Sequence, residues 1–175
     1  MRPRHLAILI GAALAAAPAS AHEHDAAVDE KASPALDRLK ALAGEWEGTA
    51  RAPGADKAHP TKASVRVVSG GSAVMLVTDP GTPHEMVTMF HGDDGALVAT
   101  HYCAAMNQPR MKAAPGGDPT KLAFEFMDGT NLGAHPAHMQ RLVVTTAGKD
   151  RHQQEWTFLD GGKPATMTMD LERKR

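Results

Sequence analysis

Residues 34–51 read PALDRLKALAGEWEGTAR, and within this stretch the chain changes from a helical to an extended pattern. Three leucines recur at intervals of three residues, and Pro34 suits the first residue of a helix because its missing N–H needs no partner there. Gly44 can end the helix, since glycine readily adopts the left-handed conformation of a C-terminal cap. The stretch therefore predicts one short helix over residues 34–42, followed by a strand over residues 46–51.

After this point, short runs rich in β-branched residues alternate with turn clusters of Gly, Asp, Pro and Ser. No helical segment separates the runs, which favours antiparallel connections. A flat sheet of about ten strands would leave open edges, so closure into an up-and-down barrel is expected, with a two-sheet sandwich as the alternative. The fold class predicted is therefore all-β, with further strands at 63–68, 73–78, 85–91, 96–103, 110–114, 121–127, 139–146, 153–159 and 165–172.

The segment Leu39–Gly48, LKALAGEWEG, resembles the G-x-W opening of the calycins, which include lipocalins, fatty-acid-binding proteins and nitrobindins. The resemblance implies that Trp46 plugs the closed end of a calycin-like barrel, that the short helix covers this end, and that Gly44 allows the tight turn between them. It extends over residues 34–175 and is nearest to nitrobindin-like and lipocalin-like bacterial domains of uncharacterised function. It implies a pocket for an apolar molecule, sometimes haem.

Two features of the sequence depart from the nitrobindin pattern. The first strand continues as Gly48-Thr49-Ala50-Arg51 without further glycines, and the stretch Thr166–Asp170 in the last strand has no histidine that could ligate iron. The cofactor therefore stays unknown, and haem is disfavoured.

The N-terminus has the pattern of a cleavable signal peptide. Met1–His5 is basic, Leu6–Ala17 is apolar, and Ala19-x-Ala21 is a cleavage pattern. The apolar run is shorter than the roughly 20 residues that span a bilayer. We therefore expect a signal peptide at residues 1–21, a flexible arm at 22–33, a periplasmic or secreted location, and no membrane insertion of the mature chain.

Charge and cysteine content exclude several classes of protein. Removing the 21 predicted signal residues, which carry two arginines, from a 175-residue chain of net charge −1 leaves 154 residues with a net charge of −3. A net negative charge gives no basic surface of the kind that binds nucleic acid. Cys103 is the one cysteine, so no internal disulfide can form. The sequence also contains no phosphate loop, dinucleotide fingerprint or nucleophile elbow.

The stretch Thr100–Pro109, THYCAAMNQP, contains the most reactive side chains. On a strand, His101 and Cys103 share one face and Tyr102 points to the other. If the first face is interior, an imidazole and a thiol about 7 Å apart could bind a ligand, ligate a soft metal, or act as nucleophile and base. Alternatively, they are a packed core cysteine and a hydrogen-bonded core histidine.

Other candidates for ligand contact are Asn107, Asn131 and His138 in loops expected at the barrel mouth, and Trp156 on the ninth predicted strand. His22 and His24 would lie at the new N-terminus, where the amine and imidazole nitrogens could chelate copper(II).

These features predict an exported protein that holds an apolar or amphipathic small molecule inside a β-barrel, with no nucleic-acid partner. One alternative is an enzyme that acts on such a molecule through His101 with Cys103 or Tyr102. A second is copper handling through His22 and His24. The sequence leaves the ligand and the oligomeric state open.

Overall fold

The computed structural model describes residues 33–116 and 118–175. The predicted signal peptide, the predicted arm up to residue 32, and the candidate copper ligands His22 and His24 lie outside these residues. The described part contains one α-helix, one 3-10 turn and ten strands. Their bounds are α1 (Ser33–Lys40), β1 (Gly44–Arg51), β2 (His59–Val68), η1 (Ser69–Gly71), β3 (Ala73–Thr78), β4 (Met86–Asp93), β5 (Ala96–Tyr102), β6 (Gln108–Ala113), β7 (Lys121–Thr130), β8 (His138–Thr146), β9 (Arg151–Asp160) and β10 (Lys163–Arg173).

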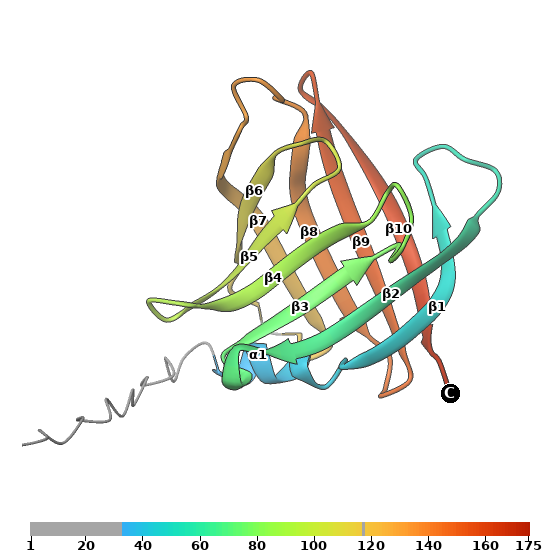
Figure 1. The fold of residues 1–175 in the computed structure, drawn as a ribbon, viewed down its shortest axis with the longest axis vertical. Coiled ribbons are helices and arrows are strands. Elements are labelled where there is room, and N and C mark those ends of the chain that lie inside the picture. Colours follow the sequence, from blue (N-terminus) through green and yellow to red (C-terminus); the bar gives the residue numbers. More distant parts are fainter. Residues whose placement is uncertain (1–32, 117) are drawn as a thin grey trace, which may run out of the picture.

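The ten strands form one closed antiparallel barrel in which each strand pairs with its neighbours in sequence. β1 also pairs with β10, and this pairing closes the sheet (Figure 1). The all-β, ten-stranded up-and-down barrel expected from the sequence is therefore confirmed, and the sandwich alternative is wrong. Each expected strand is present, with bounds shifted by a few residues. No helix in residues 33–116 and 118–175 has the length and apolar composition needed to cross a membrane.

The helix α1 lies across one end of the barrel, which we call the closed end (Figure 1). Leu36, Leu39 and Leu42 are buried there with Trp46, which is 1% exposed. The indole Nε1 of Trp46 donates a hydrogen bond to the carbonyl of Leu42 at 2.9 Å. This bond ties the start of β1 to the turn that follows α1.

Arg173, near the end of β10, also stabilises the closed end of the barrel. Its guanidinium lies 4.3 Å from the ring centroid of Trp46. It also donates to the carbonyls of Ala41 and Ala43 at 3.1 and 2.6 Å. The last strand is thus connected to the first by side-chain contacts as well as by backbone hydrogen bonds. A site can form at the opposite, open end of the barrel.

Candidate functional site

The inward face of β5 carries Leu97, Ala99 and His101, all of them buried. The register places His101 opposite Thr88 on β4. The next residue, Tyr102, points outward and is 50% exposed. The structure thereby decides which face of this strand is interior, since side chains alternate along a strand. A molecule in the lumen can contact His101, whereas Tyr102 could contact only a molecule on the outer wall.

His101 is held from two sides. Its Nδ1 lies 2.9 Å from the hydroxyl oxygen of Thr88, at hydrogen-bonding distance. Its ring centroid lies 4.9 Å from the ring of Trp156, which reaches across the lumen from β9. The fold therefore brings together two of the residues that the sequence nominated separately for ligand contact.

A chain of hydrogen bonds continues from Trp156 toward the closed end. Trp156 Nε1 donates to Gln154 Oε1 at 2.9 Å, and Gln154 Nε2 lies 3.0 Å from Nε2 of His152. Because an indole only donates, the amide of Gln154 must present its oxygen to Trp156 and its NH2 to His152. His152 Nε2 therefore accepts, and its proton is on Nδ1. The ring of His152 also packs edge-on against Trp46 at 4.3 Å.

Both inward-facing histidines have lowered pKa values. Burial lowers the pKa of His101 from 6.5 to about 4. Burial, and to a smaller degree the charge of Arg173, lowers the pKa of His152 to about 4. Each imidazole is therefore neutral at pH 7 and has one donor and one acceptor nitrogen.

Three buried polar atoms on the inward face have no hydrogen-bond partner: His101 Nε2, the hydroxyl of Thr78 and, in the closed half, Nδ1 of His152. Thr78 is 3% exposed and is the last residue of β3. On β3, Leu76 lies opposite Thr88, and Thr78 is the next inward-facing residue toward the open end. Buried polar atoms in folded proteins are almost always hydrogen-bonded to protein or to another molecule. His101 Nε2 and the Thr78 hydroxyl are the two of these atoms that lie toward the open end, since His152 lies in the closed half beside Trp46.

The mouth of the barrel, defined here by Met86, Phe158 and Met167, is apolar. These residues occupy inward-facing positions in the open half, because they lie opposite the inward-facing Thr78, Met139 and Trp156. Unlike the buried core residues of the closed half, all three are partly exposed. Methionines adapt their shape to varied apolar ligands.

The closed half of the lumen is filled. The cavity between α1 and the inward face of β2–β4, lined also by His152 and Gln154, has a volume of about 10 Å³. That volume is about the smallest that can hold one water molecule. The closed half therefore leaves no room for a ligand larger than a water molecule.

Asn107, a predicted ligand contact, joins two loops, and its side-chain Oδ1 is buried without a partner. It is fully buried, and its side-chain NH2 donates to the carbonyls of His135 and Ala137 at 2.8 and 2.7 Å. Asn131, in the same loop cluster, adopts φ 60° and its NH2 lies 3.3 Å from the carbonyl of Met106. Both amides therefore hold the β5–β6 turn against the segment that precedes β8.

His138 belongs to this loop cluster as well. Its Nδ1 lies 2.6 Å from the carbonyl of Pro136, so Nδ1 carries the proton and donates. Its ring packs on Phe126 with centroids 4.5 Å apart. The Nε2 atom of His138 is buried without a partner, so this residue keeps an acceptor that a ligand could use.

Cys103 lies one residue beyond the end of β5 and is partly buried. The strand ends at Tyr102, and the chain turns at Cys103–Met106, where the Met106 N–H donates to the Cys103 carbonyl at 3.0 Å. The expectation that Cys103 is a strand residue two positions beyond His101 is therefore wrong, because the turn interrupts the alternation. Burial raises the pKa of the Cys103 thiol, although an N–H from Ala105 partly offsets this effect.

Residues 33–116 and 118–175 contain no group of three or more His, Cys, Asp or Glu side chains placed to hold a metal ion. The inward-facing histidines come from β5 and β9, while β10 has none. Two imidazole nitrogens on the inward face have no partner: Nε2 of His101, whose other nitrogen is oriented by Thr88, and Nδ1 of His152, which carries the proton.

A hollow of about 500 Å³ lies on the outer wall across β8, β9, β10 and β1. Its charged side chains are engaged in ion pairs, with Arg151 3.3 Å from Glu172 and Glu47 3.0 Å from Lys174. The neighbouring Lys174 lowers the pKa of Glu47, with a smaller contribution from Lys62. The lining of this hollow also includes His152, whose Nδ1 is buried without a partner.

Thr78, Thr88 and His152 are absent from the residues predicted from the sequence. A signal for His152 was present, since it lies two and four residues before Gln154 and Trp156 and must share their face in any strand. No comparable signal marked the threonines, because their proximity to His101 depends on the pairing of β3, β4 and β5.

No family model matches the chain, and no curated protein matches it. Among solved structures, the chain is similar to the crystal structure of Rv2717c from M. tuberculosis, with a TM-score of 0.54, 16% identity, and coverage of 81% of this chain and 98% of that chain. A protein with unknown function from the DUF3598 family of Nostoc punctiforme matches at a TM-score of 0.44 and 12% identity, covering 78% of this chain and 48% of that chain. At such identity the likeness to Rv2717c concerns the fold alone.

Proposed function

We propose that this chain is an exported binding protein that holds one apolar or amphipathic small molecule in the open half of its barrel. The polar end of the ligand binds His101 Nε2 and the Thr78 hydroxyl, and its apolar part packs against Met86, Phe158 and Met167. The observation that carries the proposal is the position of two unpartnered, buried polar atoms beneath an apolar and partly exposed mouth. Ligand sites commonly combine an apolar lining with a few polar groups in this way.

Two further parts of the proposal have separate support. Export rests on the signal-peptide pattern of residues 1–21. Membership of the calycins rests on the G-x-W opening, on the ten strands and on α1 across the closed end.

The enzymatic alternative is less well supported by the geometry. His101 is buried in the lumen, but Tyr102 faces outward and Cys103 lies in a turn. Neither of the two suggested partners therefore lies beside His101 on the inward face of β5.

The test is native mass spectrometry of the protein from its exported fraction, together with calorimetric titration of 1-octanol into the purified chain. We expect a retained small molecule or measurable octanol binding. Thr78→Phe should fill the site and weaken binding at least tenfold. Val77→Phe adds similar bulk on the outer face of the same strand and should leave binding unchanged. Absence of both a retained mass and octanol binding, or equal binding by Thr78→Phe, would refute the proposal.

A further inference from the structure

The fully buried polar side chains of the lumen carry no charge. One carboxylate does reach an inward-facing side chain: Asp79, directly after Thr78, is partly buried, and its Oδ1 accepts a hydrogen bond from Thr61 at 2.7 Å. The buried polar residues of the described part are all neutral at pH 7, namely Thr61, Ser64, Thr78, Thr88, His101, Asn107, His152 and Gln154. We infer that the ligand end bound at His101 and Thr78 is an uncharged hydrogen-bonding group, such as an alcohol, an amide or a carbonyl. This inference rests on the proposed function and adds the chemical class of the ligand.

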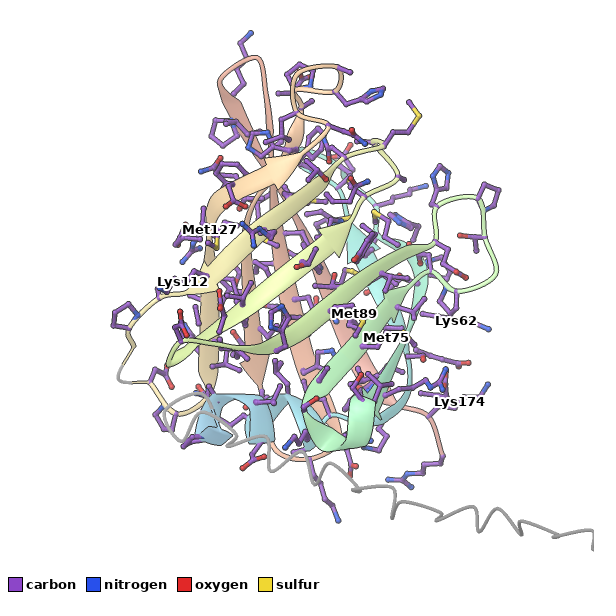
Figure 2. The ribbon with its side chains drawn as sticks, turned by 60° about the vertical axis from the view of Figure 1, so that its left-hand side comes forward. Lys62, Met75, Met89, Lys112, Met127 and Lys174 are labelled. Atoms are coloured by element: carbon purple, nitrogen blue, oxygen red, sulfur yellow. The ribbon has the colours of Figure 1, made fainter. Side chains whose placement is uncertain are left out.

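The charged side chains of the barrel wall lie outside. Figure 2 shows Lys62, Lys112 and Lys174 at the periphery of the molecule. The outer wall also carries the pairs Arg110–Asp128 and Arg141–Glu125, whose side chains are 42–51% exposed. These charges are therefore directed to solvent and cannot pair with a group inside the barrel.

Arg173 and Arg38 are both at the closed end. Arg173 is fully engaged with Trp46 and with the carbonyls of Ala41 and Ala43. Arg38 belongs to α1, which lies across that end. The filled half of the lumen separates both from the mouth, so neither compensates a charge beside His101.

The two free groups suit a neutral partner. A threonine hydroxyl donates one hydrogen bond and accepts others, and a neutral imidazole offers one nitrogen of either kind. An alcohol or amide can satisfy both. A carboxylate at His101 would be buried with no positive charge beside it and with Asp79 at the same end of the lumen. An ammonium ion at His101 would also lack a buried opposite charge, because Asp79 is only partly buried and already accepts from Thr61. Burial of an unpaired charge carries a large penalty in a medium of low dielectric constant.

The experiment compares four ligands with the same eight-carbon chain, by calorimetric titration into the purified chain at pH 7.5. The ligands are 1-octanol, octanamide, octanoate and octylammonium. Octanol and octanamide should bind at least tenfold more tightly than either ion. Thr78→Val should reduce this preference, because it removes one of the two hydrogen-bonding groups at nearly constant volume. Tyr102→Phe, which removes a hydroxyl from the outer wall, should not change it.

The possible results separate the two proposals. Octanoate or octylammonium binding as tightly as octanol would overturn this inference and leave the proposed function standing. Failure of all four ligands to bind, with no retained mass in the native spectrum, would overturn the proposed function and this inference with it. An unchanged preference in Thr78→Val would show that the selection arises elsewhere, and would overturn the assignment to Thr78.

Discussion

Asn107, which the sequence suggested as a ligand contact, holds two loops of the barrel together. Both of its N–H groups donate to loop carbonyls, and the residue is fully buried. Asn107→Ala should lower the free energy of unfolding by about 1–3 kcal/mol, because two buried carbonyls lose their donor. Urea denaturation measures this loss.

The matched control is Asn131→Gly, since Asn131 is exposed and glycine tolerates its positive φ. That variant should change the stability by less than about 0.5 kcal/mol. Equal effects of the two substitutions would contradict the view that Asn107 is the main connection between the loops.

Gly44 has two reasons to be glycine. Its φ is 138°, and a Cβ at this position would lie 2.6 Å from Nη1 of Arg173. Gly44→Ala should therefore destabilise the protein by about 2 kcal/mol or more, from backbone strain combined with displacement of Arg173 from Trp46. Thermal unfolding followed by near-ultraviolet circular dichroism measures the loss and reports on the Trp46 environment.

Gly70→Ala measures the cost of backbone strain alone, without a steric clash. Gly70 has φ 64°, and a Cβ at this position would have no atom within 4 Å, so alanine there should cost only about 1 kcal/mol. If the two variants were equally destabilised, the contact with Arg173 would have no energetic role.

At the level of elements, the barrel is closed by the pairing of β1 with β10, which we call the seam. The two backbones come very close together there, at Gly48. A Cβ at Gly48 would lie 1.9 Å from the backbone carbonyl oxygen of Asp170. Gly48→Ala must therefore push the two strands apart, and we expect a loss of more than about 2 kcal/mol or failure to fold. Hydrogen exchange of the amides of β1 and β10 should show selective loss of protection.

The neighbouring exposed residue provides the control. Thr49→Ala alters an exposed side chain in the same seam, opposite Asp170, without adding an atom at the close approach, and should stay within about 0.5 kcal/mol of the unaltered chain. Normal protection of both strands in Gly48→Ala would mean that the barrel tolerates a side chain at this position.

The whole molecule should lose stability in acid because it buries two neutral histidines. The pKa of His101 and of His152 is about 4 in the folded state and about 6.5 when unfolded. Between these values the unfolded chain binds more protons, so the free energy of unfolding falls as the pH drops from about 6.5 to 4. The loss should reach about 3 kcal/mol for each histidine.

Urea denaturation at a series of pH values between 7.5 and 4.5 tests this expectation. His101→Phe should remove part of the pH dependence, whereas His84→Gln, which alters an exposed loop histidine, should not. A free energy of unfolding that stays constant over this range would show that the two imidazoles are protonated in the folded barrel.

The order and number of the strands follow from the sequence alone. Short β-branched runs, separated by Gly, Asp and Pro and joined without helices, leave few arrangements other than an antiparallel meander. The G-x-W opening after a leucine-rich helix likewise indicated which end of the barrel is covered. These features are local, because each depends on residues only a few positions apart.

The site, by contrast, was decided by the tertiary structure. Alternation showed that His101 and Tyr102 face opposite ways, but only closure of the sheet determined which of them is inside. The contact of His101 with Trp156 joins β5 to β9 across the lumen, and the proximity of Thr88 depends on register. Such contacts connect residues far apart in the chain. The sequence pattern predicts neither the register between strands nor how far side chains reach across a barrel.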